Sequence, residues 1–365
     1  MTACTTKIVN TQSEFHQLKN EWNELNHQSA SDNLFLTYDW IECWLNFMPA
    51  NCTLFIIMVY RDDKLIGIAP FYKVPVRILW LLRSKVLRII ADQNSSAEYQ
   101  DLILHPDYAN LAISHIAREI VRSADDCLGI WIPYCDDANG STERLKQVLT
   151  EAQYSINSRK IEFYRINLPK KHDQFDAMLG TKQRNNIRRY QKKLAAKNNL
   201  EMVNLADTMS PIEAFSILET LHAQRWRARG EPGAFERHPA FRDFMRTYTQ
   251  KAAETDQLSA YCLLQDNKPI AIRFGFNYKN TLYEIQSGFD PSLNGAGIVA
   301  IDMAIKSAIT KGIETYDFLA FEGDYKQRFG AIEQPGTRLF ALKKSILGRI
   351  ISRLNLWPTG RYLQL

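Results

Sequence analysis

The chain has 365 residues, of which 45 % are hydrophobic and 23 % are charged, and its formal net charge is +5 at pH 7. This composition is typical of a soluble globular protein, and the length allows two domains with well-buried cores. The modest positive charge permits an anionic ligand but does not require nucleic acid as a partner.

Cysteine and histidine usage argues against a metal centre. The six cysteines are scattered without a C-x-x-C pair, and the seven histidines form no H-x-x-x-H pair. We therefore expect neither a metal cofactor nor a disulfide framework. The N-terminus MTACTTKIVN has no apolar signal core, and no apolar run approaches the roughly 18 residues that span a bilayer. The sequence thus predicts a cytoplasmic protein with reduced thiols.

The first half of the chain predicts two helices followed by a hairpin. Apolar residues recur at helical spacing over 11–27 and over 37–47, where Thr37 is a candidate N-cap. The apolar run at 54–60 is short enough for a strand, and after the turn RDDK the segment LIGIAPFY returns as its partner. A helix near 111–123 and a strand GIWIPY follow.

The same order recurs in the second half. The turn QDNK at Asp266 stands 204 residues after the turn RDDK at Asp62, and it lies between a strand from Leu258 and a return strand PIAIRFGF. A helix at 298–311 and a strand TYDFLA come later, at a shorter offset from their first-half counterparts. We interpret the halves as two divergent copies of one α/β unit, with chance recurrence of common patterns as the alternative.

Residues 182–197 predict a basic amphipathic helix. Seven of them are Lys or Arg and none is acidic, while three apolar residues form a narrow stripe. One interpretation is a solvated face. The other is a counter-surface for phosphate or another acidic group, in which Arg184 and Arg188, one turn apart, contact an acidic feature of the acceptor. RNA is a further partner to consider, although no recognition motif accompanies the charge.

The next helix, at 211–229, ends in a basic and aromatic cluster that includes Arg225 and Trp226. A Gly- and Pro-rich loop follows at 230–239. Loops on a rigid scaffold often cover active sites. We interpret this loop either as a lid, with Arg225 and Trp226 as substrate contacts, or as a simple connector.

Residues 281–329 hold the densest set of candidate functional groups. The pattern predicts a strand at 282–287, a small-residue loop at 294–297 and a helix at 298–311. The free N–H groups and dipole of a helix N-terminus can hold a phosphate, and glycine lets that anion approach closely. The alternative is a plain tight turn. Because the first half has HPDYANL where the second has SLNGAGI, we assign the ligand to the second copy.

Two stretches mix basic and apolar residues, at 77–90 and at the C-terminus. Each is interpreted either as a surface for an anionic membrane or as a core-facing helix or strand with basic edges. The sequence therefore leaves peripheral contact with an anionic membrane open, and the basic amphipathic tail at 346–365 is one candidate for it.

Six segments carry a family resemblance through their order and spacing: FLTYDWIECWLNF, LFIIMVYRDDKLIGIAPFY, LGTKQRNNIRRYQKKL, GAFERHPAFRDF, the strand pair ending in GFDPSLNGAGIVAIDMAI, and above all YDFLAFEGDYKQRFG. They resemble the GNAT superfamily, and more closely its tandem-domain FemAB-like branch, which includes acetyltransferase-like proteins found with bacterial exopolysaccharide and cellulose synthesis. The resemblance implies an α/β (α+β) fold with two GNAT-like lobes, each a mixed, mostly antiparallel sheet flanked by helices. We expect lobes at 1–165 and 166–345, followed by the tail at 346–365.

The resemblance also implies an acyl-coenzyme A as co-substrate, with its pyrophosphate on the loop before the central helix. In this sequence the loop comprises Leu293, Asn294, Gly295, Ala296, Gly297 and Ile298. It departs from the usual family pattern, which begins with a basic or glutamine residue and has more regular glycines. Peptidoglycan relatives use aminoacyl-tRNA as donor, and under that alternative the basic helix at 182–197 would serve the tRNA.

Transfer of an acyl group to an amine needs a base that accepts a proton and donors that stabilise the developing oxyanion. No G-x-S-x-G elbow or cysteine beside a histidine supports a covalent intermediate. Asp317, in the apolar strand TYDFLAF, is one candidate base, unless it only braces the neighbouring loop, and Glu284 is the second. Lys326 resembles a lysine that follows the last core strand in FemAB-like enzymes and would polarise the acyl carbonyl, unless it is a plain surface lysine. Tyr325 would return a proton to the leaving thiolate, unless it is a packing group.

The resemblance thus predicts an N-acyltransferase, dependent on acetyl-CoA or another acyl-CoA, that acts on an amine of an amino sugar, amino acid or lipid-linked saccharide in envelope or exopolysaccharide biosynthesis. One alternative is an aminoacyl-tRNA-dependent FemAB-like ligase. Another is a catalytically degenerate module that binds partners in a polysaccharide-synthesis complex. The acceptor, the acyl chain and the oligomeric state stay open.

Overall fold

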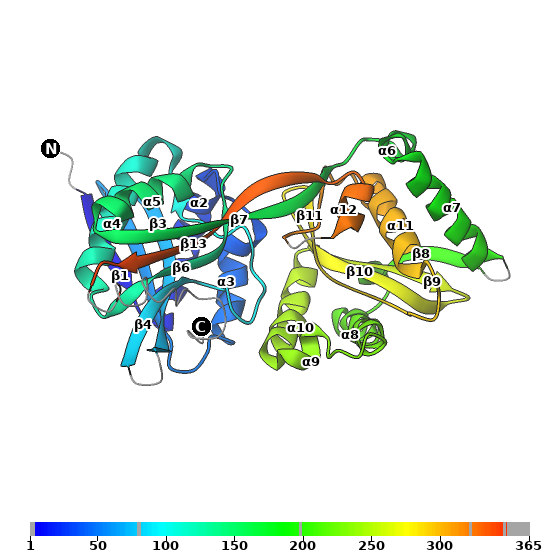
Figure 1. Ribbon diagram of the computed structural model, residues 1–365, viewed down its shortest axis with the longest axis horizontal. Coiled ribbons are helices and arrows are strands. Elements are labelled where there is room, and N and C mark those ends of the chain that lie inside the picture. Colours follow the sequence, from blue (N-terminus) through cyan, green and yellow to red (C-terminus); the bar gives the residue numbers. More distant parts are fainter. Residues whose placement is uncertain (1–3, 79–81, 197–198, 321–322, 346–347, 349–365) are drawn as a thin grey trace. The chain divides into compact units, whose positions relative to one another are not determined.

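The computed structural model describes residues 4–78, 82–196, 199–320, 323–345 and 348. The chain forms two compact units, the first made of residues 1–161 and 335–365 and the second of residues 162–334 (Figure 1). Strand β7 (Tyr154–Asn167) leads out of the first unit, and strand β13 (Ile332–Lys343) returns to it.

The first unit is a sheet with helices packed on it. Its strands lie in the order β1-β2-β3-β4-β6-β13, and all neighbours are antiparallel except the parallel pair β4–β6. The chain crosses from β4 to β6 through α4, whose Ile113, Ile116 and Ile120 recur on one helical face and are buried in the core. The elements of this unit are β1 (Cys4–Val9), α1 (Gln12–His16), α2 (Lys19–Gln28), α3 (Tyr38–Leu45), β2 (Thr53–Arg61), β3 (Lys64–Ile78), β4 (Leu82–Ile89), β5 (Ile103–Leu104), α4 (Ala109–Ser123), β6 (Cys127–Asp136) and α5 (Ser141–Glu151).

The second unit repeats this plan. Its strands lie in the order β7-β12-β11-β10-β9-β8, antiparallel except for the parallel pair β11–β12, and the chain crosses between those two strands through α11. Figure 1 shows α7 and α11 on one face of this sheet and α8 and α10 on the other. The elements are α6 (His172–Met178), α7 (Thr181–Ala195), β8 (Leu200–Asn204), α8 (Pro211–Arg227), α9 (Ala234–Arg237), α10 (Pro239–Glu254), β9 (Leu258–Gln265), β10 (Lys268–Tyr278), β11 (Thr281–Phe289), α11 (Ala296–Thr310), β12 (Thr315–Asp317) and α12 (Asp324–Arg328). The predicted α/β fold with tandem, mostly antiparallel lobes is therefore confirmed.

Most local elements lie where the pattern predicts them. Thr37 caps α3, since its hydroxyl accepts the N–H of Trp40 at 3.3 Å. The helix predicted at 11–27 is instead divided into α1 and α2 by a tight turn, in which the N–H groups of Gln17 and Leu18 donate to carbonyls three residues earlier, at 3.2 and 2.9 Å. Within the stretch at 77–90, residues 77–78 end β3 and residues 82–89 form β4, whereas residues 79–81 lie outside the described residues. The tail at 346–365 lies outside the described residues apart from Gly348.

Strand β13 belongs mainly to the first unit, whereas the sequence assigns 335–345 to the second lobe. Its residues pair with β6, for example Ala341 with Ile130 and Thr337 with Cys135. This pairing joins residues about two hundred positions apart in the chain, and such long-range pairing is not visible in local hydrophobic periodicity.

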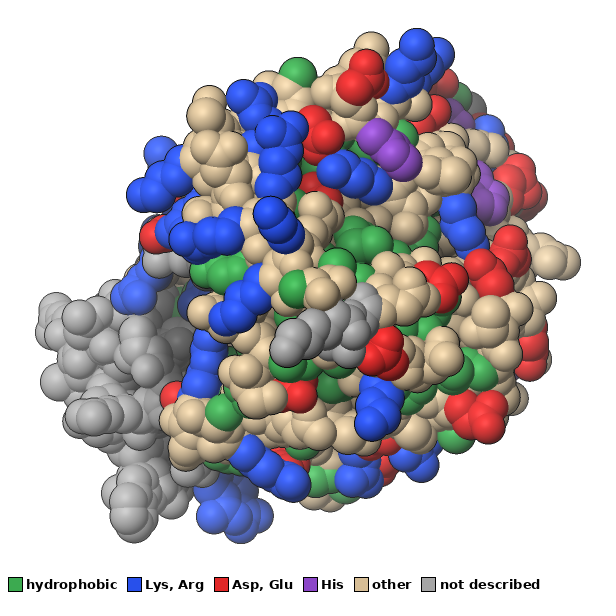
Figure 2. Space-filling view, turned by 90° about the vertical axis from the view of Figure 1, so that its right-hand side faces the viewer, with side chains coloured by type: hydrophobic (Ala, Val, Ile, Leu, Met, Phe, Trp, Pro, Cys, Tyr) green, Lys and Arg blue, Asp and Glu red, His purple; other side chains and the backbone are tan. Residues whose placement is uncertain are grey.

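Helix α7 is the basic helix that the sequence predicts. Its buried stripe, including Ile187 and Leu194, faces α11, and Gln191 donates to the Asp302 carboxylate at 3.2 Å. On its exposed side, the cations make no ion pair within the described residues. Figure 2 looks onto this side of the second unit, and Lys and Arg side chains gather in its upper left part. The exposed cations of α7 are Lys182, Arg188, Arg189, Lys192 and Lys193.

Candidate active site

A pocket of about 340 Å³ lies in the second unit, at the end of β11. Among the described residues, β11 pairs with β12 from Thr281 with Thr315 to Tyr283 with Asp317, and β11 continues beyond this pairing to Phe289. The described residues that line the pocket come from α8 and the turn after it, β10, the end of β11, the loop before α11, α11 itself and α12. They are Arg225, Arg229, Arg273, Phe289, Pro291, Leu293, Asn294, Gly295, Gly297, Ile298, Ile301 and Tyr325.

The loop before α11 has two positions at which a side chain would meet a neighbouring ring, Gly295 and Gly297. Gly295 has φ 92°, and a Cβ atom there would lie 2.3 Å from ring carbons of Tyr190. A Cβ atom on Gly297 would lie 3.1 Å from the Phe289 ring. Gly295 is the N-cap residue of α11, and no side chain in the described ranges caps the helix there. Within the described residues, the Ala296 N–H donates to the Leu293 carbonyl at 3.1 Å, whereas the N–H groups of Gly297 and Ile298 have no backbone acceptor and lie next to the pocket.

Arginine side chains form the opposite wall of the pocket. Arg225 donates from Nη1 to the Ser287 hydroxyl at 3.0 Å, and its guanidinium lies 5.2 Å from the centre of the Phe289 ring. Its Nε is buried and has no hydrogen-bond partner among the described residues. Burial, then the positive charges of Arg273 and Arg229, lower the pKa of Arg225. An anion in the pocket would relieve the repulsion among these arginines.

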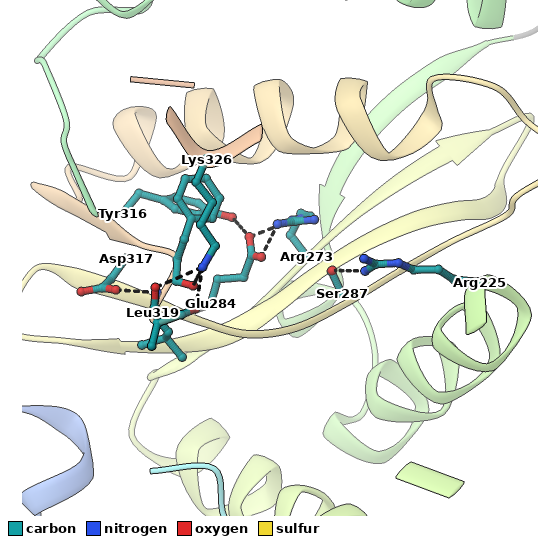
Figure 3. Close-up of polar contacts among 10 residues, drawn as sticks. Arg225, Arg273, Glu284, Ser287, Tyr316, Asp317, Leu319 and Lys326 are labelled. Atoms are coloured by element: carbon teal, nitrogen blue, oxygen red, sulfur yellow. Dashed lines mark hydrogen bonds and ion pairs between the residues drawn. The ribbon is translucent and has the colours of Figure 1, made fainter. Parts of the chain in front are cut away.

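A buried ion pair supports the floor of this site. Arg273, which is 5 % exposed, donates from Nε to Glu284 Oε2 at 2.7 Å, and a second N–H reaches the other carboxylate oxygen. The Tyr316 hydroxyl also donates to Glu284 Oε2, as Figure 3 shows. Burial opposes the charge of Arg273, but Glu284 outweighs it and raises the pKa of Arg273. Burial and Glu284 both raise the pKa of Tyr316, so this hydroxyl stays protonated.

Strand β11 carries a β-bulge at this position. Gly275 of β10 pairs with Glu284, whereas the preceding Phe274 pairs with Gln286, so Ile285 is the extra residue. Bulges bend a strand and re-aim its side chains, and they are frequent next to active sites.

Lys326 and Asp317 brace the chain at the end of β12. The Lys326 ammonium, which is 4 % exposed, donates to the carbonyl oxygens of Phe318, Leu319 and Ala320 at 3.0, 3.1 and 2.6 Å (Figure 3). Asp317 accepts the N–H of Leu319 at 2.7 Å, and Leu319 has φ 62°. Neither charged group is among the residues that line the pocket. Both stabilise the strained turn that leads into α12.

Tyr325, the second residue of α12, reaches the pocket. It is 38 % exposed and lines the same wall region as Arg273 and Arg225. Desolvation raises the pKa of Tyr325, while Arg273 opposes that shift. The phenol therefore carries its proton at neutral pH, as a proton donor must.

The structure brings most of the predicted loop and two other predicted residues into one pocket. Leu293, Asn294, Gly295, Gly297 and Ile298 line it together with Arg225 and Tyr325, and Ala296 is buried in the same turn. The guanidinium groups of Arg225 and Arg229 each lie 5.5 Å from the centre of the Trp226 ring.

Arg184 and Arg188 do not line the pocket. Arg184 donates to the carbonyl of Asp176 at 3.1 Å, and Arg188 is exposed on α7. Helix α7 approaches the site through Tyr190, which packs on Gly295.

Sequence reasoning missed Arg229, Arg273 and Phe289. Arg273 carries a detectable signal, since a charge within the apolar strand PIAIRFGF must be buried with a partner or reach a ligand. Arg229 follows Arg225 by four residues, which is the spacing of neighbours on a helical face.

Residues 181–327 match the family described as the acetyltransferase (GNAT) domain. The fold is similar to the crystal structure of FemX, with a TM-score of 0.62, 11 % identity, and coverage of 92 % of this chain and 98 % of that one. It is also similar to a conserved protein of unknown function from Bacteroides thetaiotaomicron, with a TM-score of 0.57, 12 % identity, and coverage of 92 % of this chain and 100 % of that one. A third similar structure is the C-terminal domain of a putative lysylphosphatidylglycerol synthetase from Agrobacterium fabrum, with a TM-score of 0.52, 10 % identity, and coverage of 94 % of this chain and 96 % of that one. No curated protein matches the chain.

The family match and the pocket inside it define an acyltransferase of the GNAT type. Residues 181–327 thus match a GNAT domain, and the chain has a fold similar to that of FemX, in line with the predicted resemblance. Along the described parts of the chain, no helix combines the length and apolar character needed to cross a bilayer. Nor do the described ranges contain a group of three His, Cys, Asp or Glu side chains placed to hold a metal ion.

Proposed function

We propose that the protein is an acyl-CoA-dependent N-acyltransferase, with acetyl-CoA as the first donor to test. The observation that carries this proposal is the pocket itself. There the glycine loop before α11, the arginines at the end of α8 and just after it, and Tyr325 converge beside the part of β11 that extends beyond its pairing with β12. The helix N-terminus and the arginines suit phosphates, and the apolar side chains of Ile298 and Ile301 suit an uncharged arm.

The reaction assigns each predicted residue a role. The acceptor amine attacks the thioester carbonyl, loses a proton to a base, and expels a thiolate that takes a proton from Tyr325. Asp317 and Glu284 remain the proposed bases, each reached through water because neither lines the pocket. Lys326 remains the proposed group that polarises the carbonyl, and to do so it must exchange one of its backbone carbonyl partners.

The acceptor is proposed to be an amine of an amino sugar, an amino acid or a lipid-linked saccharide in envelope or exopolysaccharide assembly. Arg184 and Arg188 remain the proposed contacts for an acidic feature of that acceptor, and Arg225 and Trp226 the proposed contacts nearer the reaction. A cytoplasmic location with peripheral contact to an anionic membrane also stays a proposal.

An aminoacyl-tRNA donor is the second candidate, and one observation favours it. The exposed cations of α7 form no ion pair within the described residues, although most other exposed arginines on α8 and α10 do, such as Arg227 with Glu236 and Arg246 with Glu219. An unpaired basic helix face suits a polyanionic backbone.

Calorimetric titration separates the two donors. Saturable binding of acetyl-CoA in the micromolar range, with no competition from tRNA, supports the first proposal, and binding of tRNA alone supports the second. Tyr325→Phe tests the proton-donor role, because it removes only the hydroxyl. We expect kcat to fall about tenfold or more with KM nearly unchanged, whereas unchanged kcat would remove Tyr325 from the mechanism.

A further inference from the structure

Arg273 is a buried charged residue that nevertheless reaches the pocket. It lies on β10 and is one of the residues that line the pocket, although its side chain is almost completely buried. Its partner Glu284, on β11, is also buried and is not among the described residues that line the pocket. The ion pair therefore presents its positive end to the pocket and keeps its negative end behind.

The guanidinium of Arg273 has donors that Glu284 does not use. A guanidinium carries five N–H groups in a planar fork. The pair with Glu284 engages Nε and Nη2, so the N–H groups of Nη1 lie outside this pair. Figure 3 shows this end of Arg273 on the side turned away from Glu284. Because Tyr316 also donates to Glu284, the carboxylate is fixed behind the guanidinium, and the remaining donors are oriented before any ligand binds.

The β-bulge in β11 decides that Glu284 can hold Arg273. Residues two apart on a strand share a face, and Glu284 pairs with Gly275, so Arg273 and Glu284 lie on the same face of the sheet. Without the extra residue Ile285, that residue would stand opposite Gly275 and Glu284 would face the other side. The bulge thus places an anchored guanidinium, rather than an unpaired charge, at the pocket.

Tyr325 indicates which part of a substrate would lie beside Arg273. Both residues line the pocket, and although burial raises the pKa of Tyr325, the charge of Arg273 lies close enough to oppose that shift. In the proposed reaction Tyr325 gives its proton to the leaving thiolate, so the sulfur lies beside the phenol. The acyl carbonyl carbon is bonded to that sulfur, and its oxygen therefore lies near the Nη1 donors of Arg273.

We infer that Arg273 is a catalytic residue whose Nη1 donors stabilise the oxyanion that forms on the acyl carbonyl. This inference rests on the proposed acyltransferase function. The amine nitrogen bonds to the carbonyl carbon while the π electron pair moves to the oxygen. The carbonyl then re-forms and the C–S bond breaks, the amine proton passes to the base, and the Tyr325 proton passes to the thiolate. Arg273 can act without giving up a contact, whereas Lys326 must first exchange one of its backbone carbonyl partners.

The experiment compares the affinities of two stable analogues for the intact chain by calorimetric titration. S-ethyl-CoA lacks the carbonyl oxygen of acetyl-CoA, whereas the carboxylate of S-carboxymethyl-CoA stands in for the oxyanion. The ratio of the two affinities reports the donors at the acyl position and cancels the contribution of the rest of CoA.

Two variants and one control are measured in this way. The double substitution Arg273→Met with Glu284→Met removes both charges together and leaves neither one buried alone. Arg273→Lys keeps the charge but lacks the planar fork. Arg229→Gln is the control for the general positive charge of the pocket, because Arg229 lines the pocket as well. Thermal unfolding without ligand identifies any variant that does not fold.

We expect wild type to bind S-carboxymethyl-CoA about tenfold or more tightly than S-ethyl-CoA. The double variant should lose this preference while binding S-ethyl-CoA within about twofold of wild type, and Arg273→Lys should reduce the preference about threefold or more. Arg229→Gln should weaken both analogues by a similar factor and keep the ratio. If the double variant does not fold, Arg273→Lys alone decides.

Three results refute the role of Arg273 while the proposed function stands: wild type has no preference, a folded Arg273 variant keeps the full preference, or Arg229→Gln abolishes it too. If wild type binds neither analogue, the proposed function fails and the role of Arg273 fails with it.

Discussion

Tyr190 of α7 packs directly on Gly295, the N-cap residue of α11, so that a Cβ atom at position 295 would lie 2.3 Å from the tyrosine ring. This contact joins the basic helix to the loop that lines the pocket. The two features that stood out separately in the sequence are therefore parts of one structure, and a change in either should be felt at the ligand.

Gly295→Ala should impair both folding and ligand binding. Its φ of 92° disfavours alanine and the methyl group meets Tyr190, so we expect a loss of about 1–3 kcal/mol in unfolding free energy and a weaker affinity for CoA. Denaturant unfolding and calorimetry measure the two effects. Gly180→Ala is the control, since a Cβ atom at position 180 would have no neighbour within 4 Å and the φ of Gly180 is −62°. A Gly295→Ala protein with unchanged CoA affinity would separate this loop from the ligand site.

Lys326→Ala and Asp317→Asn should each lower turnover about tenfold or more. Because the Lys326 ammonium donates to three carbonyl oxygens while buried, we also expect its loss to cost about 3 kcal/mol of stability. Turnover must therefore be divided by the folded fraction, measured under the assay conditions. If the corrected kcat of both variants equals that of wild type, these residues only brace the turn at Leu319 and take no part in the chemistry.

Glu284→Gln should destabilise the second unit by about 3–5 kcal/mol, because it leaves the Arg273 charge buried without its partner. The double substitution Arg273→Met with Glu284→Met should recover much of that loss, since it removes both charges together. Urea unfolding of the four proteins gives the coupling energy. Additive losses, with no coupling between the two positions, would contradict the buried pair.

Because of Asp101, the stability of the folded state should fall as pH rises from about 4 toward 7. Burial raises the pKa of this carboxyl from 3.8 to about 7, although Ser141 donates to it at 2.6 Å. The folded state thus holds its proton more tightly than the unfolded chain, so its favourable contribution is complete below about pH 4 and is lost as pH rises toward 7. Asp101→Asn should therefore gain stability relative to wild type between pH 5 and pH 8, as thermal melts would show. The exposed Asp125→Asn should show no such trend, and parallel curves for Asp101→Asn and wild type would exclude the effect.

Local pattern was sufficient for the elements and for much of the pocket wall. The apolar periodicity of α4 and α11 reflects one buried face of each helix, so the sequence carries it directly. The Gly295 to Gly297 loop was recognisable because only small residues permit that backbone and that close contact. These features depend on neighbours three or four residues away, and a single sequence displays them.

The partners of charged groups depend on distant neighbours, and here the folded chain was needed. Lys326 and Tyr325 are adjacent in sequence, yet one turns inward to backbone carbonyls and the other reaches the pocket. Arg273 interrupts an apolar strand in the sequence, and only the packing of β10 beside β11 brings it to Glu284. Hydrophobic burial follows from residue type and spacing alone, whereas an ion pair or a ligand pocket requires side chains that only long-range strand and helix packing brings together.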